Sequence, residues 1–382
     1  MDSASRSFRC NGSPISECRP SKVRKTSRNS SSSSSSSSEK PRAVVPSTYF
    51  PSTKLGFWAN EFLPMALHEP KVTKKSCPVG ITMLSDDILG KCFFNGYLDT
   101  FETLKLTSLN KRTRRVGLTQ IQHLDLRKCK NLTVDQVTIT ALVYQNLRSL
   151  DFAYNPKFGR DHLSALVETS KNLRHLVLKG TAVDDHALIE YLKEVHSRFG
   201  ECKLLSLDLC AVSKDTCLKI GDKAVEAISQ YCPKLKCLKL GWCKNVTDNG
   251  IGSISKLKRL TELDLSLTSI TIKSCYNLLE ILGPNLEVLD LSATSIFQLD
   301  ESRDSAEWIT FSKVQNLSTL KLQFCEQLSA ALIEHIVQNA ASLKSFDVKH
   351  SGAEGTIRLT EEQAYKLCAR NIRVTGVTMI KR

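Results

Sequence analysis

Residues 232–251 read CPKLKCLKLGWCKNVTDNGI and contain the pattern that decides the fold. Leu235, Leu238 and Leu240 fill the apolar positions of an L-x-x-L-x-L segment, and Cys243 follows three residues after the last leucine. Thr247 then opens an amphipathic segment. Because this layout returns along most of the chain, a repeated unit has to be identified before any local feature is interpreted.

Nine such segments occur at spacings of 25 to 31 residues, beginning at Ile121, Leu147, Leu173, Leu204, Leu235, Leu260, Leu286, Leu317 and Leu343. A degenerate tenth is expected at residues 372–377. Helix-like patterns lie between them at 133–146, 184–199, 221–232, 271–282, 329–340 and 360–370, the first opening with a capping box of Thr133 and Gln136. A unit of strand, turn and helix is the design of leucine-rich repeats. The sequence therefore predicts an α/β fold, a right-handed solenoid or horseshoe with parallel strands inside and helices outside.

The position three residues past each segment holds a small side chain: Cys129, Asn155, Thr181, Val212, Cys243, Thr268, Thr294, Cys325 and Ser351. A turn buried between stacked repeats has backbone groups to satisfy, which Asn, Thr and Ser can do, while Cys fills space at little polar cost. We expect a structural ladder here. Its cysteines lie a repeat apart without a C-x-x-C pair, so no metal site and no cofactor are predicted.

The N-terminal part differs in composition. The chain has a net charge of +14, and residues 1–80 hold 13 Lys/Arg against 5 Asp/Glu. A serine run at 30–38 and sparse apolar residues predict a disordered basic tail, followed to residue 80 by a proline-punctuated linker. Because the basicity lies mostly in this tail, binding of nucleic acid by the folded part is not expected.

Fourteen cysteines in a long chain with a polar opening and no signal peptide predict reduced, buried thiols in the cytoplasm or nucleus. No apolar run approaches the roughly 18–20 residues that span a bilayer, so no membrane partner is expected. There is no nucleophile elbow, phosphate loop or H-E-x-x-H, and the protein is not predicted to be an enzyme.

Residues 81–116 form a short helical pattern that resembles an F-box. The residues that match the family are a start at 84–88 (LSDDI), a Tyr-Leu-Asp step at 97–99, spaced leucines, and a basic run at 111–115 (KRTRR). Ser85 stands where the family has proline, Asn95-Gly96 is an insertion, and Asn110 and Thr113 replace a common Cys or His and a common Trp. The match covers about 35 residues, counted on the sequence.

The resemblance implies a protein that grips a Skp-type adaptor of a cullin complex. The adaptor-binding candidates are Leu84, Ile88, Leu98, Leu104 and Leu109. The predicted division of the chain is a tail and linker at 1–80, an F-box-like module at 81–117 and the repeats at 118–382. The alternative for 81–117 is a helical cap that covers the apolar edge of the first repeat, which every solenoid must shield.

The outward positions of the strands suggest a binding surface. The fifth position reads Asp125, Asp151, Val177, Asp208, Lys239, Asp264, Asp290, Lys321 and Asp347, and an acidic row repels itself unless it is offset. The nearby cations expected to offset it are Lys128, Arg148, Arg174, Lys179 and Lys344. Either Asp208 and Lys239 contact a partner, or the charges of the row are a general feature of the repeat and are solvated.

Tyr154, Trp242 and Phe324 each fall just before a ladder residue, where large side chains are expected to be exposed at the rim and to anchor a partner. Packing on neighbouring turns is the alternative. The longer loops at 199–202, 212–219 and 297–305 are expected to shape the choice of partner.

The leading functional hypothesis is therefore a substrate-recognition subunit of an SCF-type cullin–RING E3 ubiquitin ligase, with an unknown protein substrate on the concave face. The alternative is a leucine-rich-repeat interaction scaffold without a ligase role. A third possibility is nucleic-acid binding by the basic tail, which predicts steep salt dependence.

Overall fold

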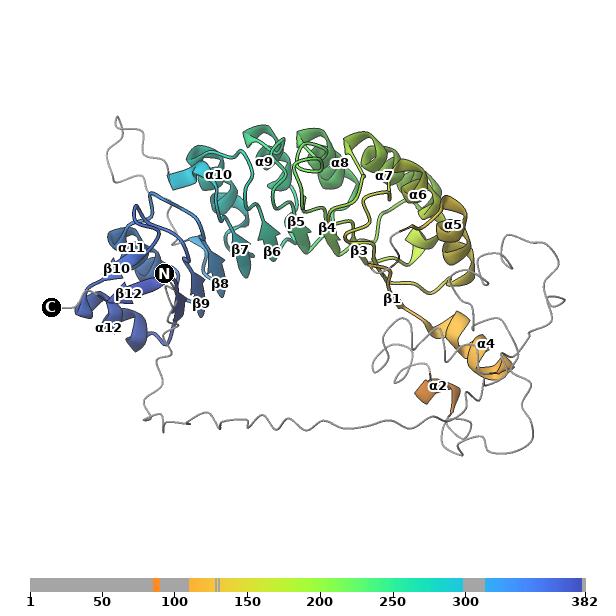
Figure 1. The fold of residues 1–382 in the computed structure, drawn as a ribbon, viewed down its shortest axis with the longest axis horizontal. Helices are drawn as coiled ribbons and strands as arrows, with labels where there is room; N and C mark the ends of the chain where they lie inside the picture. Colours follow the sequence, from red (N-terminus) through yellow and green to blue (C-terminus); the bar gives the residue numbers. More distant parts are fainter. Residues whose placement is uncertain (1–84, 90–109, 128, 130, 298–312, 380–382) are drawn as a thin grey trace, which may run out of the picture.

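The computed structural model describes residues 85–89, 110–127, 129, 131–297 and 313–379. The predicted tail, the linker, most of the F-box-like segment and most of the loop at 297–305 lie outside these residues. The described chain forms an arch in which strands line the inner side and helices cover the outer side (Figure 1). This is the predicted α/β leucine-rich-repeat solenoid.

The inner side is one ten-stranded parallel sheet in which β1 to β9 follow chain order and β11 completes the edge. Equivalent leucines are in register from strand to strand, so that Leu238 pairs with Leu207 on one side and Leu263 on the other. The strands are β1 (His123–Asp125), β2 (Ser149–Asp151), β3 (His175–Val177), β4 (Ser206–Asp208), β5 (Cys237–Lys239), β6 (Glu262–Asp264), β7 (Val288–Asp290), β8 (Thr319–Lys321), β9 (Ser345–Asp347) and β11 (Arg373–Thr375).

Helices return the chain from the end of one strand to the start of the next. They are α5 (Val134–Val143), α6 (Arg160–Ala165), η3 (Val167–Lys171), α7 (Asp185–Phe199), α8 (Asp222–Tyr231), α9 (Asp248–Ile254), α10 (Ile272–Leu282), η4 (Ser295–Phe297), α11 (Ala330–Asn339) and α12 (Glu361–Ala369). Local sequence fixes their starts. Thr133 and Gln136 cap α5 reciprocally, as the sequence predicts, and Asp184 and Ser329 accept a backbone N–H at the starts of α7 and α11.

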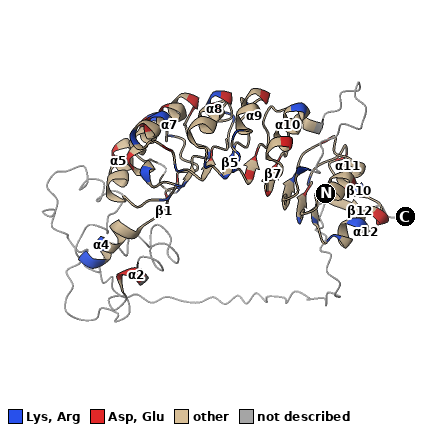
Figure 2. Cartoon of the chain, turned by 180° about the vertical axis from the view of Figure 1, so that it is seen from behind, with Lys and Arg blue, Asp and Glu red and all other residues tan. Residues whose placement is uncertain are grey.

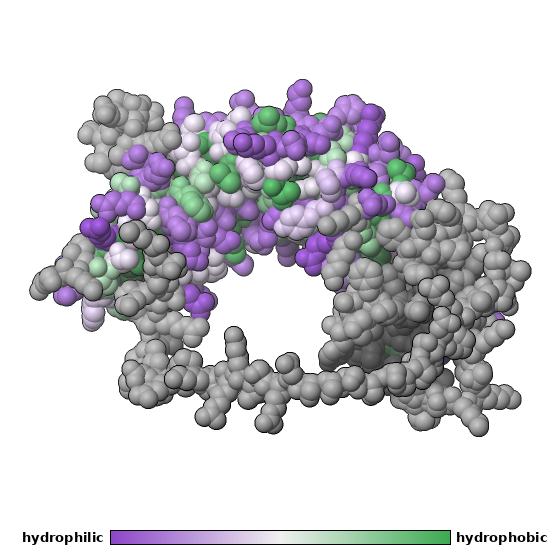
Figure 3. Space-filling view, viewed as in Figure 1, coloured by the Kyte–Doolittle hydropathy of each residue, from purple (hydrophilic) through white to green (hydrophobic). Residues whose placement is uncertain are grey.

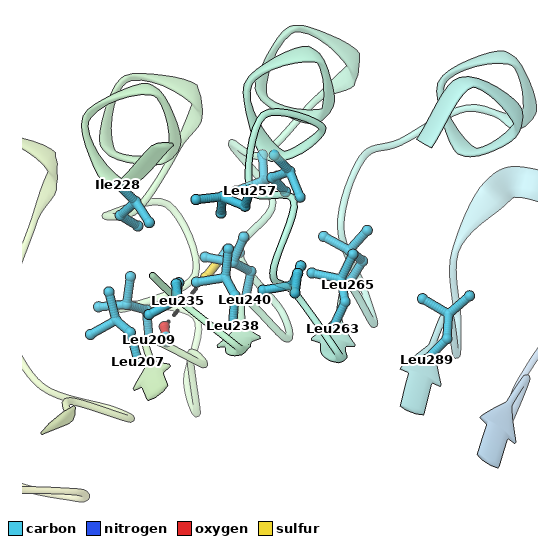
Figure 4. Close-up of a cluster of buried hydrophobic side chains, with 14 of the residues drawn as sticks. Leu207, Leu209, Ile228, Leu235, Leu238, Leu240, Leu257, Leu263, Leu265 and Leu289 are labelled. Atoms are coloured by element: carbon cyan, nitrogen blue, oxygen red, sulfur yellow. Dashed lines mark hydrogen bonds between the residues drawn. The ribbon is translucent and has the colours of Figure 1, made fainter. Parts of the chain in front are cut away.

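The core runs without interruption between sheet and helices. In Figure 4, the leucines of β4 to β7 point from the strands toward Ile228 of α8 and Leu257 beyond α9. Leu207, Leu238 and Leu263 are fully buried. Each such side chain contributes about 1.5–3 kcal/mol, and each is covered by the repeats on both sides, so neighbouring repeats stabilise one another.

The C-terminal end closes the array differently from the middle. Strand β11 lies within the segment predicted as a tenth strand and pairs with β9. A separate two-stranded parallel sheet, β10 (Ile357–Leu359) with β12 (Val377–Met379), flanks it.

The N-terminal end contains α2 (Asp86–Ile88) and α4 (Lys111–Gln120). The basic run opens α4, whereas the sequence places it at the end of the preceding helical module. Asn110 and Thr113 form a capping box at this start. Helix α4 therefore runs through the boundary predicted at residue 117. Asp86 of α2 joins Arg112 at 2.7 Å and Arg115 at 3.0 Å, and the hydrogen bond from Arg112 lowers the pKa of Asp86.

Candidate binding face

The floor of the concave face is built from strand residues whose side chains alternate with the buried leucines. In the six repeats that have Asp at the fifth position, Oδ1 accepts the backbone N–H two residues on, at the end of the strand. The acceptors are Asp125, Asp151, Asp208, Asp264, Asp290 and Asp347. Each Asp of the acidic row therefore has a local structural role, because it accepts a backbone N–H of the turn that follows its strand. This role agrees with the alternative in which the acidic row is an ordinary feature of the repeat.

The cations that offset this row differ from those expected. Arg127 joins Asp125 at 2.5 Å and Asp151 at 3.4 Å, Lys321 joins Asp290 at 3.3 Å, and Lys349 joins Asp347 at 3.6 Å. No ion pair joins the acidic row to the four expected cations that are described. The expectation for these four cations was therefore wrong. Arg148, Arg174 and Lys344 lie at strand starts and do not reach the strand ends, and Lys179, which follows the end of β3, lies over the Tyr154 ring instead. Lys128 lies outside the described residues.

Asp208 and Lys239 lie side by side at the middle of this floor. They are register partners in β4 and β5, and Lys239 also forms an ion pair with Glu262 at 2.6 Å. Asp208 uses Oδ1 for the N–H of Cys210 at 3.0 Å. Both side chains are half-buried, so each presents part of its charge to the concave side.

The ladder position behaves as a structural element. Asn155 is buried and donates its side-chain amide to the carbonyls of Leu126 and Phe152, at 3.1 and 2.9 Å. Thr181, Thr268 and Thr294 donate to the last strand leucine of their own repeat. Cys243, Cys325 and Ser351 donate to the same carbonyl of the preceding repeat. Different residue types thus satisfy the same kind of carbonyl.

Burial also determines the chemistry of the thiols. It raises the pKa of Cys243 to about 12 and that of Cys325 to about 11, so both remain protonated near neutral pH. Thiolates are the form that binds metal or attacks a substrate. Within the ranges described above, no group of three or more His, Cys, Asp or Glu side chains is placed to hold a metal ion. Cys368 departs from the expectation of reduced cysteines, because it is disulfide-bonded.

The position just before the ladder has an unusual backbone. In six repeats a residue other than glycine has a left-handed φ between 53° and 63°: Tyr154, Trp242, Leu267, Ala293, Phe324 and His350. Gly180 has φ 66° at the same register. The left-handed region costs about 1–2 kcal/mol for a residue with Cβ. Backbone hydrogen bonds between repeats hold it in place, as from Trp242 N to Ser266 O at 2.6 Å and from Phe324 N to Lys349 O at 3.0 Å.

The strained backbone turns large apolar side chains toward solvent. Phe324 is 57% exposed, Tyr154 51% and Leu267 42%. Trp242 is half-buried, which corrects the expectation that it is exposed to the same degree. We call Tyr154, Trp242, Leu267 and Phe324 the apolar rim. Apolar patches interrupt the polar surface over the repeats in Figure 3.

The candidate substrate-binding residues form a line and not a cluster. Tyr154 follows β2, Trp242 follows β5 and Phe324 follows β8, so each is three strand spacings from the next. Strands are about 4.8 Å apart, which places the aromatic side chains about 14 Å from one another along the rim. Only Trp242, Asp208 and Lys239 belong to neighbouring strands. A partner that contacts all three aromatics must be elongated.

Sequence reasoning missed two members of this surface, Leu267 and His350, and gave Lys179 a different role. Leu267 occupies the rim position without being aromatic. His350 stacks on Phe324 with ring centroids 4.9 Å apart, and Lys179 lies 5.9 Å from the centre of the Tyr154 ring. Reading the register position before the ladder in every repeat, whatever its residue type, finds Leu267 and His350.

The candidate adaptor-binding residues Leu84, Leu98, Leu104 and Leu109 lie outside the described residues. Ile88 ends α2. The neighbouring Leu89 is fully buried and belongs to the same apolar core cluster as Val116 of α4. No helix in the described part of the chain is long and apolar enough to cross a membrane.

Comparisons with known proteins find F-box/LRR-repeat proteins that are similar to part of this chain. No family model matches the chain. Bovine F-box/LRR-repeat protein 4 is 33% identical over 155 residues, or 39% of this chain and 23% of that protein. F-box/LRR-repeat protein 12 of Arabidopsis thaliana is 29% identical over 32% of this chain and 26% of that protein. BTB/POZ domain-containing protein FBL11 of Arabidopsis thaliana is 24% identical over 62% of this chain and 23% of that protein.

The chain thus spans about a quarter of the length of the curated relatives it matches. At modest identity and partial coverage, these relatives support the F-box/leucine-rich-repeat family. Among solved structures, internalin C2 of Listeria monocytogenes is 19% identical over 65% of this chain and 84% of that one, with a TM-score of 0.39. Rad7 in its complex with Elc1 from yeast is 16% identical over 78% and 89%, with a TM-score of 0.34.

Proposed function

We propose that this protein is the substrate-recognition subunit of an SCF-type cullin–RING E3 ubiquitin ligase. The F-box-like segment docks a Skp-type adaptor, and the concave face with its apolar rim holds the protein to be ubiquitinated. The F-box/LRR-repeat relatives and the F-box-like residues at 84–115 support the adaptor half of this proposal. The proposed location is the cytoplasm, the nucleus or both.

The observation that carries the substrate half is the apolar rim. Exposed aromatic side chains in a left-handed backbone contribute little to the core, and they occupy a conformation that glycine adopts at lower cost. Strain of this kind collects at sites of recognition. Aromatic anchors surrounded by polar contacts are also the residues that most often dominate protein interfaces.

The protein itself performs no bond-making step in this proposal and needs no cofactor. Holding the substrate beside the ligase raises its effective concentration there, which accelerates transfer without any new chemistry. The adaptor and cullin complex supply the remaining components.

The adaptor half is tested by co-expression with a Skp-type adaptor and affinity purification. We expect the adaptor to co-purify with the intact chain and to be lost with Leu98→Asp. The matched control is Leu142→Asp in α5, where the leucine is already 58% exposed and the change should leave adaptor binding intact. An adaptor that fails to bind the intact, folded chain rules out the ligase proposal.

The runner-up is an interaction scaffold in which the N-terminal module serves as a cap. The burial of Leu89 and the ion pairs of Asp86 with α4 favour it. Deleting residues 81–109 distinguishes the two proposals while leaving α4 in place. A pure cap predicts loss of solubility and aggregation, whereas the ligase proposal predicts a folded protein that has lost its adaptor.

A further inference from the structure

A second charged surface lies at five successive connections, where the chain passes from a helix to the next strand. The five connections at 145–148, 168–174, 198–205, 230–236 and 255–261 hold ten Lys and Arg residues but two acidic residues. Glu168 pairs with Arg198, and Glu201 pairs with Lys234 at 2.7 Å. The other eight cations have no ion pair with any described residue. We call them the basic edge: Arg148, Lys171, Arg174, Lys203, Lys236, Lys256, Lys258 and Arg259.

The sheet aligns the strand starts, which makes Arg148 and Arg174 neighbours and leaves Leu205 between Arg174 and Lys236. The N–H of Arg174 donates to Arg148 O at 2.8 Å, the N–H of Leu205 to Arg174 O at 2.7 Å, and the N–H of Lys236 to Leu205 O at 2.8 Å. The strand starts are therefore aligned, and five strands place the basic edge along about 19 Å. Blue segments recur along the inner side of the arch between β1 and β7 in Figure 2.

Structural roles account for little of this charge. A helix dipole favours a cation in the last helical turn, which explains Lys171 at the end of η3. Arg148, Arg174 and Lys236 lie beyond the helices and are exposed. Arg148 and Arg174 occupy the same position on adjacent strands, where like charges destabilise a sheet. A row that the fold does not require, and that costs stability, calls for a partner of opposite charge.

We propose that the basic edge binds an Asp/Glu-rich segment of the substrate protein, while the apolar rim at the opposite ends of the strands holds an apolar part of it. This inference rests on the proposed function and specifies its substrate class. The cations are spread over five connections and do not converge on one point, as they would for a single phosphate. An extended segment of about six residues spans the same 19 Å.

The described part of the basic edge has no stacking platform for a single-stranded nucleic acid. Tyr144, just before the first connection, is 1% exposed, and Phe199 and Tyr231 are half-buried. Sequence-tolerant binding of single strands relies on exposed aromatic side chains among the cations. Among the described residues, the exposed aromatics Tyr154 and Phe324 lie at the other ends of the strands, and Tyr276 and Tyr365 lie on the helices α10 and α12. An acidic peptide, which needs only charge and hydrogen-bond donors, fits this edge better.

The test is fluorescence anisotropy with the full chain and a labelled twelve-residue peptide in which Glu and Asp alternate with Gly and Ser. The variant combines Arg148→Glu, Lys236→Glu and Lys258→Glu. Its matched control combines Lys193→Glu, Lys214→Glu and Lys244→Glu, three exposed residues away from the strand starts, with the same change in net charge. The N-terminal tail is basic in every protein compared, so the difference between the two variants isolates the basic edge.

We expect the edge variant to raise the Kd of the peptide about tenfold or more at low salt, and the control variant to change it far less. The peptide with Gln and Asn in place of Glu and Asp should bind no better to the wild type than to the edge variant. Equal weakening by both variants overturns the proposal. Tighter binding of a twelve-nucleotide single strand through the same residues overturns it in favour of nucleic acid. Adaptor co-purification is measured separately, so failure here leaves the ligase proposal standing.

Discussion

The ladder and the position before it, which holds the apolar rim in four repeats, are consecutive in the chain, yet the fold constrains them in opposite ways. Ladder residues such as Asn155, Cys243 and Ser351 differ in type but donate to the same kind of carbonyl. Seven described residues at the position before the ladder share one left-handed backbone conformation, yet their side chains range from glycine at 180 to tryptophan at 242. The fold therefore determines which hydrogen bond a ladder side chain makes. At the rim it determines only the backbone conformation, which leaves the rim side chains free for recognition.

The largest effect should come from the leucine core on which both positions depend. Leu238→Asp places an unpaired carboxylate between repeats and should lower the free energy of unfolding by more than about 4 kcal/mol. Several repeats should unfold together, as measured by circular dichroism during denaturation. Leu218→Asp is the control, because Leu218 is 58% exposed. A stable Leu238→Asp protein contradicts the register of the sheet.

A smaller loss is expected at the ladder. Asn155→Ala removes one of two donors to each of two carbonyls, which keep the backbone N–H groups of Cys129 and residue 155, and should cost about 1–2 kcal/mol. Chemical denaturation measures this loss, and binding of any partner at temperatures where the variant is folded should be unchanged. If Asn155→Ala weakened binding without affecting stability, the division between ladder and rim would be wrong.

Substitutions in the apolar rim should leave the stability of the protein nearly unchanged. Tyr154→Gly and Phe324→Gly relieve the left-handed strain but increase the entropy of the unfolded chain, so the free energy of unfolding should change by no more than about 1 kcal/mol. Gly180 already serves at this position in the intact protein. The same thermal and denaturant measurements apply. A loss near that of Leu238→Asp would show that the rim is part of the core.

The smallest effect concerns two histidines on the concave floor. Burial, followed by the charge of Arg148, lowers the pKa of His123, and burial, followed by His123 and Arg174, lowers that of His175, from an ordinary 6.5. Below pH 6.5 the unfolded chain binds these protons more readily than the folded one. The free energy of unfolding should therefore fall as the pH drops below 6.5. His123→Gln with His175→Gln should flatten this dependence, and an unchanged slope in the variant would contradict this origin.

The spacing of leucines predicts nearly all of the fold, because a core shared by stacked repeats allows few other arrangements. Capping residues such as Thr133 and Gln136 predict helix starts for the same reason, since they act locally. The site is less predictable. The half-burial of Trp242 depends on neighbouring repeats, and the misassigned Arg148 and Arg174 show that strand position, and not proximity in sequence, determines which charges meet.

The start of α4 could have been predicted from the sequence. Asn110 and Thr113 form a local capping signal, yet the similarity of this stretch to an F-box drew the helix boundary elsewhere. The left-handed backbone of the rim, by contrast, has no signature in residues such as Tyr154 or Phe324. It arises from hydrogen bonds between repeats, as from Tyr154 N to Lys179 O at 2.8 Å, which a single repeat does not contain.

The central claim is that the apolar rim recognises a substrate while a separate module binds the adaptor. Quantitative affinity purification of the intact chain and of the variant combining Tyr154→Gly with Phe324→Gly tests it directly. We predict that the variant retains the Skp-type adaptor at wild-type levels and loses at least one other protein that the intact chain captures. Recovery of the same proteins in the same amounts by both forms would contradict the claim.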